Sequence, residues 1–221
     1  MLPHLRLLQL ASPSLPVGAY AYSQGLEWAV EAGWVHDEAS LREWLAEQLE
    51  HSLERVDLPV LCRALHAARR DDVPALSEWA ARLVAMRETS ELVADDANRG
   101  AALLRLLRDL DVPAADGWLG RGRVPFVVPY ALAACRWDIE DDVAVASYAW
   151  SWLENQALAG VRLIPLGQAA SQRVMLEVAE RIPGAASRAM ALEDDDIGGT
   201  LPSLAIASSR HETQYTRLFR S

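Results

Sequence analysis

The sequence predicts an all-α protein, a single-domain helical bundle with a central, nearly all-apolar helix and a flexible C-terminal tail. Segments rich in Leu, Ala and Glu at helical spacing dominate the chain, and the strict apolar–polar alternation typical of strands is hard to find. The 221 residues, of which 51% are hydrophobic, are enough for one domain with a sizeable core. One segment, from about residue 140 to residue 164, is apolar on nearly every helical face, which is typical of a helix inside a bundle.

The first three helices are predicted from apolar spacing and from capping residues. The first ends before residue 12, because two prolines and a glycine between residues 12 and 18 prevent its continuation. A second is expected from about Tyr20 to Ala32. The third is expected to begin at Ser40, which forms a capping-box signature with Glu43. The apolar residues of the first helix are Leu5, Leu7, Leu8 and Leu10.

The middle of the chain predicts a helical hairpin followed by a long helix. The hairpin comprises residues 58–69 and 73–86, turning at Asp71 and Asp72, with Pro74 suited to a first helical turn. The long amphipathic helix covers residues 88–110, and the Gly-, Pro- and Asp-rich residues 111–123 are expected to form a loop. Residues 124–130 are the one weak candidate for a strand, but their two prolines favour an approach to a helix.

The last third predicts the central helix, another from about Gln168 to Arg181, and a short one after Pro183 and Gly184. We divide the chain into a helical domain, residues 1–207, and a C-terminal partner-binding tail, residues 208–221. The tail carries three arginines against one glutamate, whereas the chain as a whole has a net charge of −10. Such a tail can fold back on the acidic body or be held out for a partner.

Composition excludes several classes of protein. There is no lysine, so phosphate-loop NTPases, protein kinases and Schiff-base enzymes are excluded. The net negative charge argues against nucleic acid or a membrane surface as the main partner. The charge-free run from Leu7 to Leu26 is broken by prolines and glycines and is not a transmembrane helix. With no secretory signal pattern and two distant cysteines, Cys62 and Cys135, the chain is expected to be cytoplasmic.

No catalytic or metal-ligating set emerges, so we predict no enzymatic activity, no cofactor and no bound metal. Ser23 lies in a sequence one residue away from a nucleophile elbow, but no strand precedes it. His211 and Glu212 begin like a zinc motif whose second histidine is replaced by Tyr215. Cys62 and His66 could reach one metal ion from the same helix face, although no second ligand pair has matching spacing.

The tail is the most informative segment for function. Tyr215, Leu218 and Phe219 would share one face of a helical turn, flanked by Arg217 and Arg220. Aromatic and arginine side chains are typical of interface hot spots, so this face is expected to bind a partner. The alternative is a frayed terminus.

Three segments together resemble the UreF family of urease accessory proteins. They are residues 8–27, from Leu8-Gln-Leu-Ala-Ser-Pro-Ser-Leu-Pro-Val-Gly18 to Tyr22-Ser-Gln-Gly-Leu-Glu27; residues 148–168, with Ser151-Trp-Leu-Glu-Asn-Gln156 and Leu163-Ile-Pro-Leu-Gly-Gln168; and the tail Arg210-His-Glu-Thr-Gln-Tyr-Thr-Arg-Leu-Phe-Arg-Ser221. Residues 87–89 and 98–102 also resemble the family pattern, whereas residues 111–140 match poorly. Ala19 and Ala21 stand where the family usually has glycine and serine, and Arg162 where it often has lysine.

This resemblance implies an all-helical, non-enzymatic chaperone that dimerises and bridges two partners during nickel delivery to apo-urease. The partners would be the accessory protein UreD, also called UreH, and the GTPase UreG, with apo-urease reached through the complex. The tail would order against the UreD-like partner, with Tyr215 and Phe219 as anchors, and Glu27 and Arg162 would face the GTPase. The tail residues expected at the interface are Arg210, His211, Glu212, Gln214, Tyr215, Arg217, Leu218, Phe219 and Arg220.

Two alternatives remain from other classes of protein. The chain could be a GTPase-activating protein in which Arg162 or Arg87 reaches the transferring phosphate. A weaker alternative is a hydrolase that uses Ser23.

Overall fold

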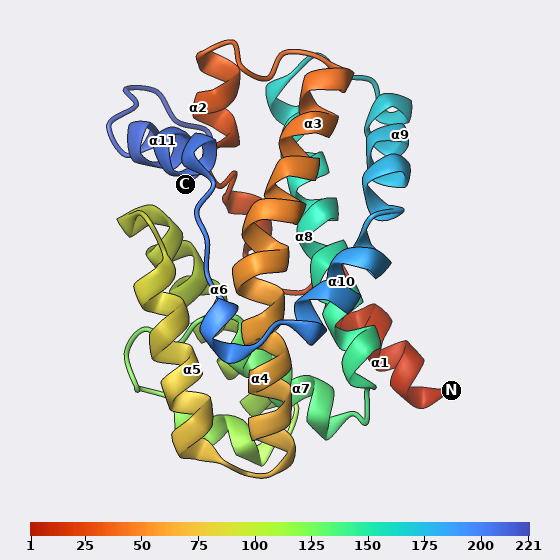
Figure 1. Ribbon diagram of the computed structural model, residues 1–221, viewed down its shortest axis with the longest axis vertical. Coiled ribbons are helices and arrows are strands. Elements are labelled where there is room, and N and C mark those ends of the chain that lie inside the picture. The colour runs from red at the N-terminus through yellow and green to blue at the C-terminus, as the bar shows by residue number, and fades with distance from the viewer.

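A long helical column runs through the centre of the molecule. The structure, a computed structural model, describes all residues from 1 to 221 and contains helices and no strand. In the column, α3 (Glu38–Gln48), a π-helical segment (Leu49–Asp57) and α4 (Leu58–Arg69) follow one another without a break (Figure 1). Backbone dihedrals stay helical at both junctions, with φ −59° and ψ −47° at Leu49 and φ −67° and ψ −43° at Leu58.

Pro59 lies inside this column, where a proline would be expected to break a helix. It has no N–H to offer to the carbonyl oxygen of Arg55, four residues earlier. That oxygen instead accepts a hydrogen bond from the backbone N–H of Gly198, at 3.0 Å. The linker between α10 (Ile182–Ala191) and α11 (Pro202–His211) is thereby docked on the column.

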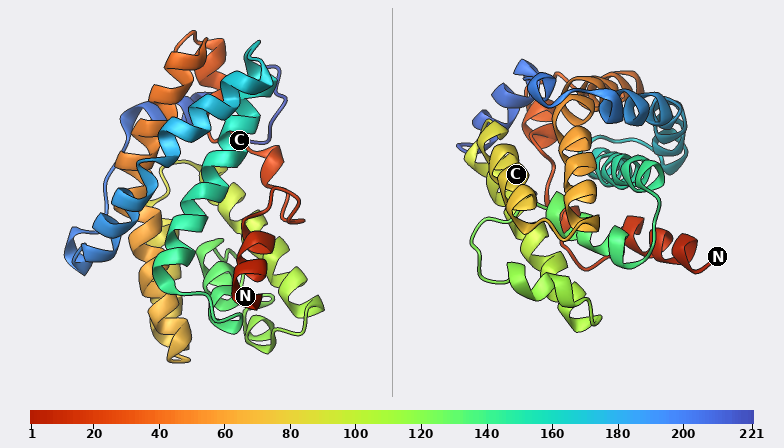
Figure 2. Two further views of the ribbon diagram at one scale, coloured as in Figure 1. Left: turned by 90° about the vertical axis from the view of Figure 1, so that its right-hand side faces the viewer. Right: turned by 60° about the horizontal axis from the view of Figure 1, so that its bottom comes forward.

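The remaining helices cover the column on two sides (Figures 1 and 2). On one side lie α5 (Val73–Met86), α6 (Ser90–Asp109) and α7 (Val127–Arg136); on the other lie α1 (Leu2–Ala11), α8 (Asp141–Leu163), α9 (Gln168–Ala179) and α10. The hairpin of α4 and α5 has the predicted bounds, and Asp71 in its turn has φ +53°. The all-α prediction is confirmed. No helix combines the length and apolar character needed to cross a membrane.

Helix α8 matches the predicted central helix and crosses α3 at close range. Tyr148, Leu153 and Ala157 are buried along it. A Cβ on Gly160 would lie 2.6 Å from Cδ2 of Leu41, so a larger residue here would force the Leu41 side chain to move. Val143 and Leu158 were expected in the core but are 37% and 40% exposed, so α8 is not buried on all of its faces.

The second predicted helix, Tyr20 to Ala32, is wrong in its first half. Residues Ala19–Ala21 form a 3₁₀ turn, and α2 covers only Leu26–Glu31. Between them Gln24 and Gly25 have φ +52° and +82°, outside the helical region. Ala19 and Ala21, which replace the glycine and serine usual in the family, lie within the 3₁₀ turn and have no positive φ, so alanine causes no backbone strain there. Gly18, with φ +73°, has the left-handed conformation.

Other boundaries also differ from prediction. Helix α3 is capped by Asp37, whose carboxylate accepts from Ser40 N–H at 2.8 Å, rather than by Ser40 with Glu43. Pro183 and Gly184 lie in the first turn of α10 rather than before a helix. The sequence did not predict α11, which runs across residues 207 and 208 without a break. Residues 111–123 contain a 3₁₀ turn, Pro113–Trp118, with Trp118 buried.

Candidate partner-binding site

The C-terminal segment, residues 212–221, leaves α11 and packs back against the N-terminal end of the chain. The backbone N–H of Arg220 donates to the carbonyl of Ala21 at 2.8 Å. The carbonyl oxygen of Ser221 accepts from the N–H groups of Ser23 at 2.6 Å and Gln24 at 3.1 Å. These bonds satisfy backbone groups in the turn that interrupts the expected second helix. The segment is thus built into the fold.

A buried carboxylate, that of Glu27 on α2, holds this segment in place. Its two oxygens accept the backbone N–H groups of Leu218, at 2.6 Å, and Phe219, at 2.9 Å. Nε2 of His211 lies 3.1 Å from the same carboxylate. Glu27 is only 8% exposed, so these three contacts replace the water that a carboxylate would otherwise bind.

His211, the last residue of α11, is fully buried between two carboxylates. Its Nε2 faces Glu27, and its Nδ1 lies 2.7 Å from Glu91 on α6. Both ring nitrogens therefore lie within hydrogen-bond distance of a carboxylate oxygen. The guanidinium of Arg217 adds a positive charge, with Nη1 2.9 Å from Glu91. His211 and Arg217 thus tie the end of α11 and the tail to Glu27 and Glu91.

The start of α6 is tied to the end of α11. The Glu212 carboxylate accepts from the N–H and the hydroxyl of Ser90, at 3.1 and 2.6 Å, at the N-terminus of α6 where negative charge is favoured. The hydroxyls of Thr89 and Ser208 are hydrogen-bonded at 2.7 Å. Helix α11 and the segment after it consequently share one anchoring surface on α2 and α6.

Phe219 closes the far end of the segment. Its side chain is buried, and the Arg162 guanidinium lies 4.6 Å from its ring centroid. Arg162, near the end of α8, also donates from Nη1 to the carbonyl of Tyr20 at 3.0 Å and remains exposed. Arg162 therefore links the tail to α8 and still reaches solvent.

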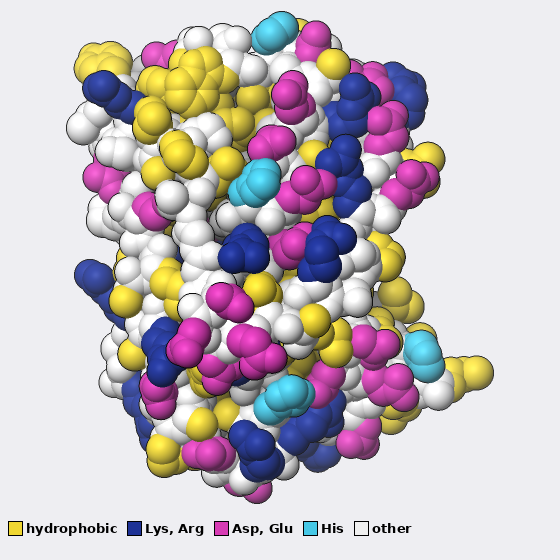
Figure 3. Space-filling model, in the orientation of Figure 1, with side chains coloured by type: hydrophobic (Ala, Val, Ile, Leu, Met, Phe, Trp, Pro, Cys, Tyr) yellow, Lys and Arg dark blue, Asp and Glu magenta, His cyan; other side chains and the backbone are white.

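The middle of the segment points away from the molecule. Tyr215 is completely exposed, and Leu218 is 56% exposed. Ile206 of α11 is also exposed, and Figure 3 shows hydrophobic side chains gathered over α2 and the C-terminal segment at the upper left. Exposed arginines flank this area at Arg210, Arg217 and Arg220. The tail thus presents aromatic, aliphatic and guanidinium groups between two fixed ends.

The predicted site residues are partly brought together. The tail residues form one structure, but Tyr215 and Phe219 do not share the expected helical face, because residues 212–221 are not helical and Phe219 points inward. Glu27 was expected to face a partner and is instead buried under the tail. Glu91 was not among the predicted site residues, although its neighbours Arg87 to Thr89 belong to a segment that resembles the family.

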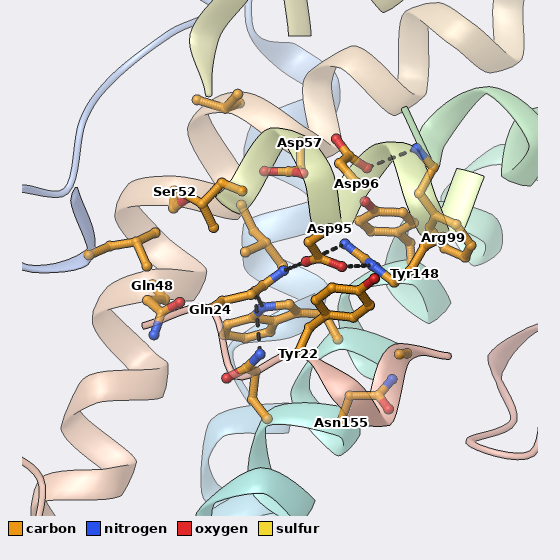
Figure 4. Close-up of a pocket in the computed structure, with 18 of the residues that line it drawn as sticks. Tyr22, Gln24, Gln48, Ser52, Asp57, Asp95, Asp96, Arg99, Tyr148 and Asn155 are labelled. Atoms are coloured by element: carbon orange, nitrogen blue, oxygen red, sulfur yellow. Dashed lines mark hydrogen bonds and ion pairs between the residues drawn. The ribbon is translucent and has the colours of Figure 1, made fainter. Parts of the chain in front are cut away.

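A second polar cluster lies beneath the tail, between the column, α6 and α8 (Figure 4). Arg87 bridges Asp57 and Asp96, with shortest contacts of 2.6 and 2.8 Å, and Arg99 pairs with Asp95 at 2.5 Å. Burial by itself would raise the pKa of Asp96, but the charges of Arg87 and Arg99 and the N–H of Phe126 outweigh it and lower that pKa. Arg87 is thus occupied by a structural ion pair.

The residues considered for catalysis or metal binding, Ser23, Cys62 and His66, do not form an active site or a metal site. The Ser23 hydroxyl is buried and donates to Ser221 at 2.6 Å. Burial raises the pKa of the Cys62 thiol to about 11, and His66 lies 3.6 Å from Asp141. These groups form neither a catalytic triad nor a shared ligand set.

The fold and this site define an all-helical protein whose docked C-terminal segment displays a surface of interface type. The family model UreF matches residues 35–179. The chain is 52% identical to the urease accessory protein UreF of Alkalilimnicola ehrlichii, over 98% of this chain and 95% of that protein. It is 49% identical to the UreF of Pseudomonas putida strain W619, over 98% and 97%, and 48% identical to that of Azoarcus sp. strain BH72, over 100% and 97%. The chain belongs to the UreF family of urease accessory proteins.

Proposed function

We propose that this chain is a non-enzymatic scaffold that bridges a UreD-like (UreH-like) accessory protein and a UreG-like GTPase, in the cytoplasm, during delivery of nickel to apo-urease. The observation that carries the proposal is the docked C-terminal segment, which is fixed by Glu27 and His211 and exposes Tyr215 and Leu218. Because this segment is already ordered, a partner that binds it pays little conformational entropy. The family membership supports a role beside other urease accessory proteins.

The UreD-like partner is assigned to the exposed face of the tail. We expect Tyr215→Ala to weaken binding of that partner roughly 30-fold, the effect of losing one hot-spot tyrosine. The tyrosine ring has no packing to lose within this chain, so the fold should be unchanged. Isothermal titration calorimetry with the UreD-like protein measures the change. Leu176→Ala, an exposed leucine on α9, is the matched control, and equal affinities for both variants would contradict the assignment.

The GTPase-facing side is assigned to the region of Arg162, the exposed member of the two residues expected there. Glu27 would influence the GTPase only through the tail, because its carboxylate is buried. One observation favours the alternative function, that of a GTPase-activating protein. Arg162 is an exposed guanidinium held in position by the Phe219 ring and the Tyr20 carbonyl, as an arginine finger would be.

GTP turnover by the UreG-like protein separates the scaffold from a GTPase-activating protein. A scaffold predicts that Arg162→Ala weakens GTPase binding without a rate effect at saturating concentration. A loss of about a thousandfold in stimulated turnover at saturation would instead establish the arginine finger. Arg87 is not a candidate for this role, because its guanidinium is engaged by Asp57 and Asp96.

We further propose that the protein is a homodimer formed through α1 and an adjacent groove. Leu2, Leu5 and Leu8, spaced by three residues, are each more than half exposed on one side of α1. In Figure 3 the end of α1 projects at the lower right, and in the left view of Figure 2 it lies beside α8. An open, mostly apolar groove of about 730 Å³ borders it on α8 and α10. Its apolar lining is Leu7, Val143, Ala146, Trp150, Ala179, Ile182, Pro183, Ala186 and Met190.

The exposed leucines of α1 and the groove lie side by side on one face of the molecule. A two-fold axis would therefore place the α1 leucines of each copy in the groove of the other copy. We expect Leu5→Asp to convert the dimer to a monomer while the helical content stays constant. Light scattering coupled to size exclusion gives the mass. Leu176→Asp, which changes an exposed leucine outside the groove, should leave the dimer intact, and a dimeric Leu5→Asp variant would refute this interface.

A further inference from the structure

Two arginines beside the exposed face of the tail have no charged partner. The guanidinium groups of Arg210 and Arg220 are exposed, and neither makes an ion pair or a side-chain hydrogen bond. Arg217, which lies between them in the sequence, is instead paired with Glu91. Two positive charges of the tail are therefore unpaired in a chain whose net charge is −10.

The carboxylates around the tail are already engaged by other groups. Glu27 accepts two backbone N–H groups of the tail, and Glu91 contacts Arg217. Glu31 accepts from a side-chain amide of the tail, and Glu212 accepts from the start of α6. None of these four carboxylates forms an ion pair with the two unpaired arginines. The positive charge on this face is thus not neutralised from within the chain.

The unpaired arginines lie beside apolar side chains that also point outward. Ile206 and Arg210 are four residues apart on α11, so they are neighbours along its exposed side. Leu218 and Arg220 are both exposed, whereas the residue between them is buried. Tyr215, which is completely exposed, lies between these two pairs in the sequence. Apolar groups and unpaired guanidinium groups therefore share one outward face.

This combination fits an acidic protein surface better than a lipid or nucleic-acid surface. A guanidinium group pairs with a carboxylate through two parallel hydrogen bonds, and tyrosine and arginine are enriched at the centres of protein interfaces. Membranes and nucleic acids would attract the same arginines, but they are extended anionic surfaces that the net charge of −10 repels. A protein partner can place its carboxylates only where the arginines lie.

We propose that the surface with which the UreD-like partner meets the tail is acidic, with an apolar pocket for Tyr215 and carboxylates that pair with Arg210 and Arg220. The inference rests on the proposed function, because it describes the partner assigned there to the tail. At such an interface the charges set the rate of association, and the buried anchor sets the rate of dissociation. The two arginines therefore accelerate association, and the tyrosine slows dissociation.

Stopped-flow kinetics of the full-length protein with the UreD-like protein separates these two effects. We expect the double variant Arg210→Glu, Arg220→Glu to associate at least about tenfold more slowly than wild type at about 50 mM salt, because both charges then repel the acidic surface. The difference should nearly vanish at about 0.5 M salt, which screens exposed charges. Neither side chain makes a contact within the chain, so the fold should be unchanged. Tyr215→Ala should instead raise the dissociation rate.

A control variant with the same change in net charge is Arg70→Glu, Arg136→Glu. Both arginines are exposed, have no ion pair and lie at the ends of α4 and α7, away from the tail (Figure 1). This control should associate at nearly the wild-type rate, and Arg210→Lys, Arg220→Lys should keep the wild-type dependence on salt. Equal slowing in the control and the tail variant would attribute the effect to net charge and contradict the proposal.

The remaining outcomes distinguish this inference from the proposed function. If the wild type binds the UreD-like protein and the tail variant associates at the same rate with the same salt dependence, the acidic surface is refuted and the partner assignment stands. If the wild type does not bind that protein at all, the proposed function itself is refuted. Vesicles of phosphatidylcholine and phosphatidylserine should not sediment the wild type. Sedimentation that the tail variant abolishes would identify a lipid surface and overturn the proposal.

Discussion

Replacing Glu27 by alanine is expected to release the C-terminal segment from the body of the protein. The change removes the acceptor of the Leu218 and Phe219 N–H groups and one of the two carboxylates around the buried His211. Removing the carboxylate of the buried Glu27–His211 pair costs about 3 kcal/mol. This corresponds to roughly 150-fold more of the state in which the C-terminal segment is detached. Trypsin cleavage after Arg217 should accelerate accordingly, since cleavage follows the open population when reclosing is fast.

Glu31→Ala is the matched control for this change, because Glu31 lies on the same helix, is exposed and contacts the tail only through the Gln214 side chain. Its tail should keep nearly wild-type protection from trypsin. Hydrogen exchange at residues 212–221 provides an independent readout. Wild-type exchange rates in the Glu27→Ala variant would show that the carboxylate does not hold the segment.

Replacing Arg87 by methionine is expected to destabilise the whole fold. The Arg87, Asp57 and Asp96 side chains are 13%, 7% and 3% exposed, and the substitution removes the guanidinium that contacts both carboxylates. We expect a loss of about 3–5 kcal/mol in the free energy of unfolding at pH 7, measured by urea denaturation. Arg108→Met, which breaks an exposed pair with Asp109, should cost less than about 1 kcal/mol.

The loss of stability in the Arg87→Met variant should depend on pH in a definite direction. In the wild type the folded-state pKa of Asp96 is lowered below its ordinary value of 3.8, so its contribution is present above that pH and is lost as the pH falls below it. Removing Arg87 takes away the largest of the charges that oppose burial, so the pKa of Asp96 rises relative to the wild type. The difference in the free energy of unfolding between variant and wild type should therefore narrow as the pH is lowered from 7 toward the pKa of this carboxyl. A gap of constant size would contradict this account.

Helices with strong local signals were predictable from sequence. The hairpin of α4 and α5 and the central helix α8 followed from apolar periodicity and from the residues at their ends. The continuity of the column through Pro59 was not predictable, because the Arg55 carbonyl that Pro59 leaves unpaired binds the N–H of Gly198, which lies far along the chain. The shortened α2 has a similar cause: the carbonyl of Ser221 stabilises a turn that local sequence alone does not favour.

The candidate site shows the same division. The chemical character of the tail, with Tyr215, Leu218 and its arginines, was visible in the sequence, and so was the importance of the segment around Glu27. The sequence did not reveal the inward position of Phe219 or the burial of Glu27, because both follow from contacts between residues more than 180 positions apart. Periodicity within the tail predicted a helical turn, whereas the Glu27 carboxylate binds the N–H groups of Leu218 and Phe219 directly.

The most direct test of the bridging role is light scattering coupled to size exclusion on the protein mixed with its UreD-like and UreG-like partners. Wild type, Tyr215→Ala and a variant ending at Ile206 would be compared. We predict a stoichiometric complex of all three proteins for the wild type, a weakened complex for Tyr215→Ala and none for the truncated chain. A truncated chain that forms the full complex would contradict the assignment of the docked C-terminal segment as the partner-binding site.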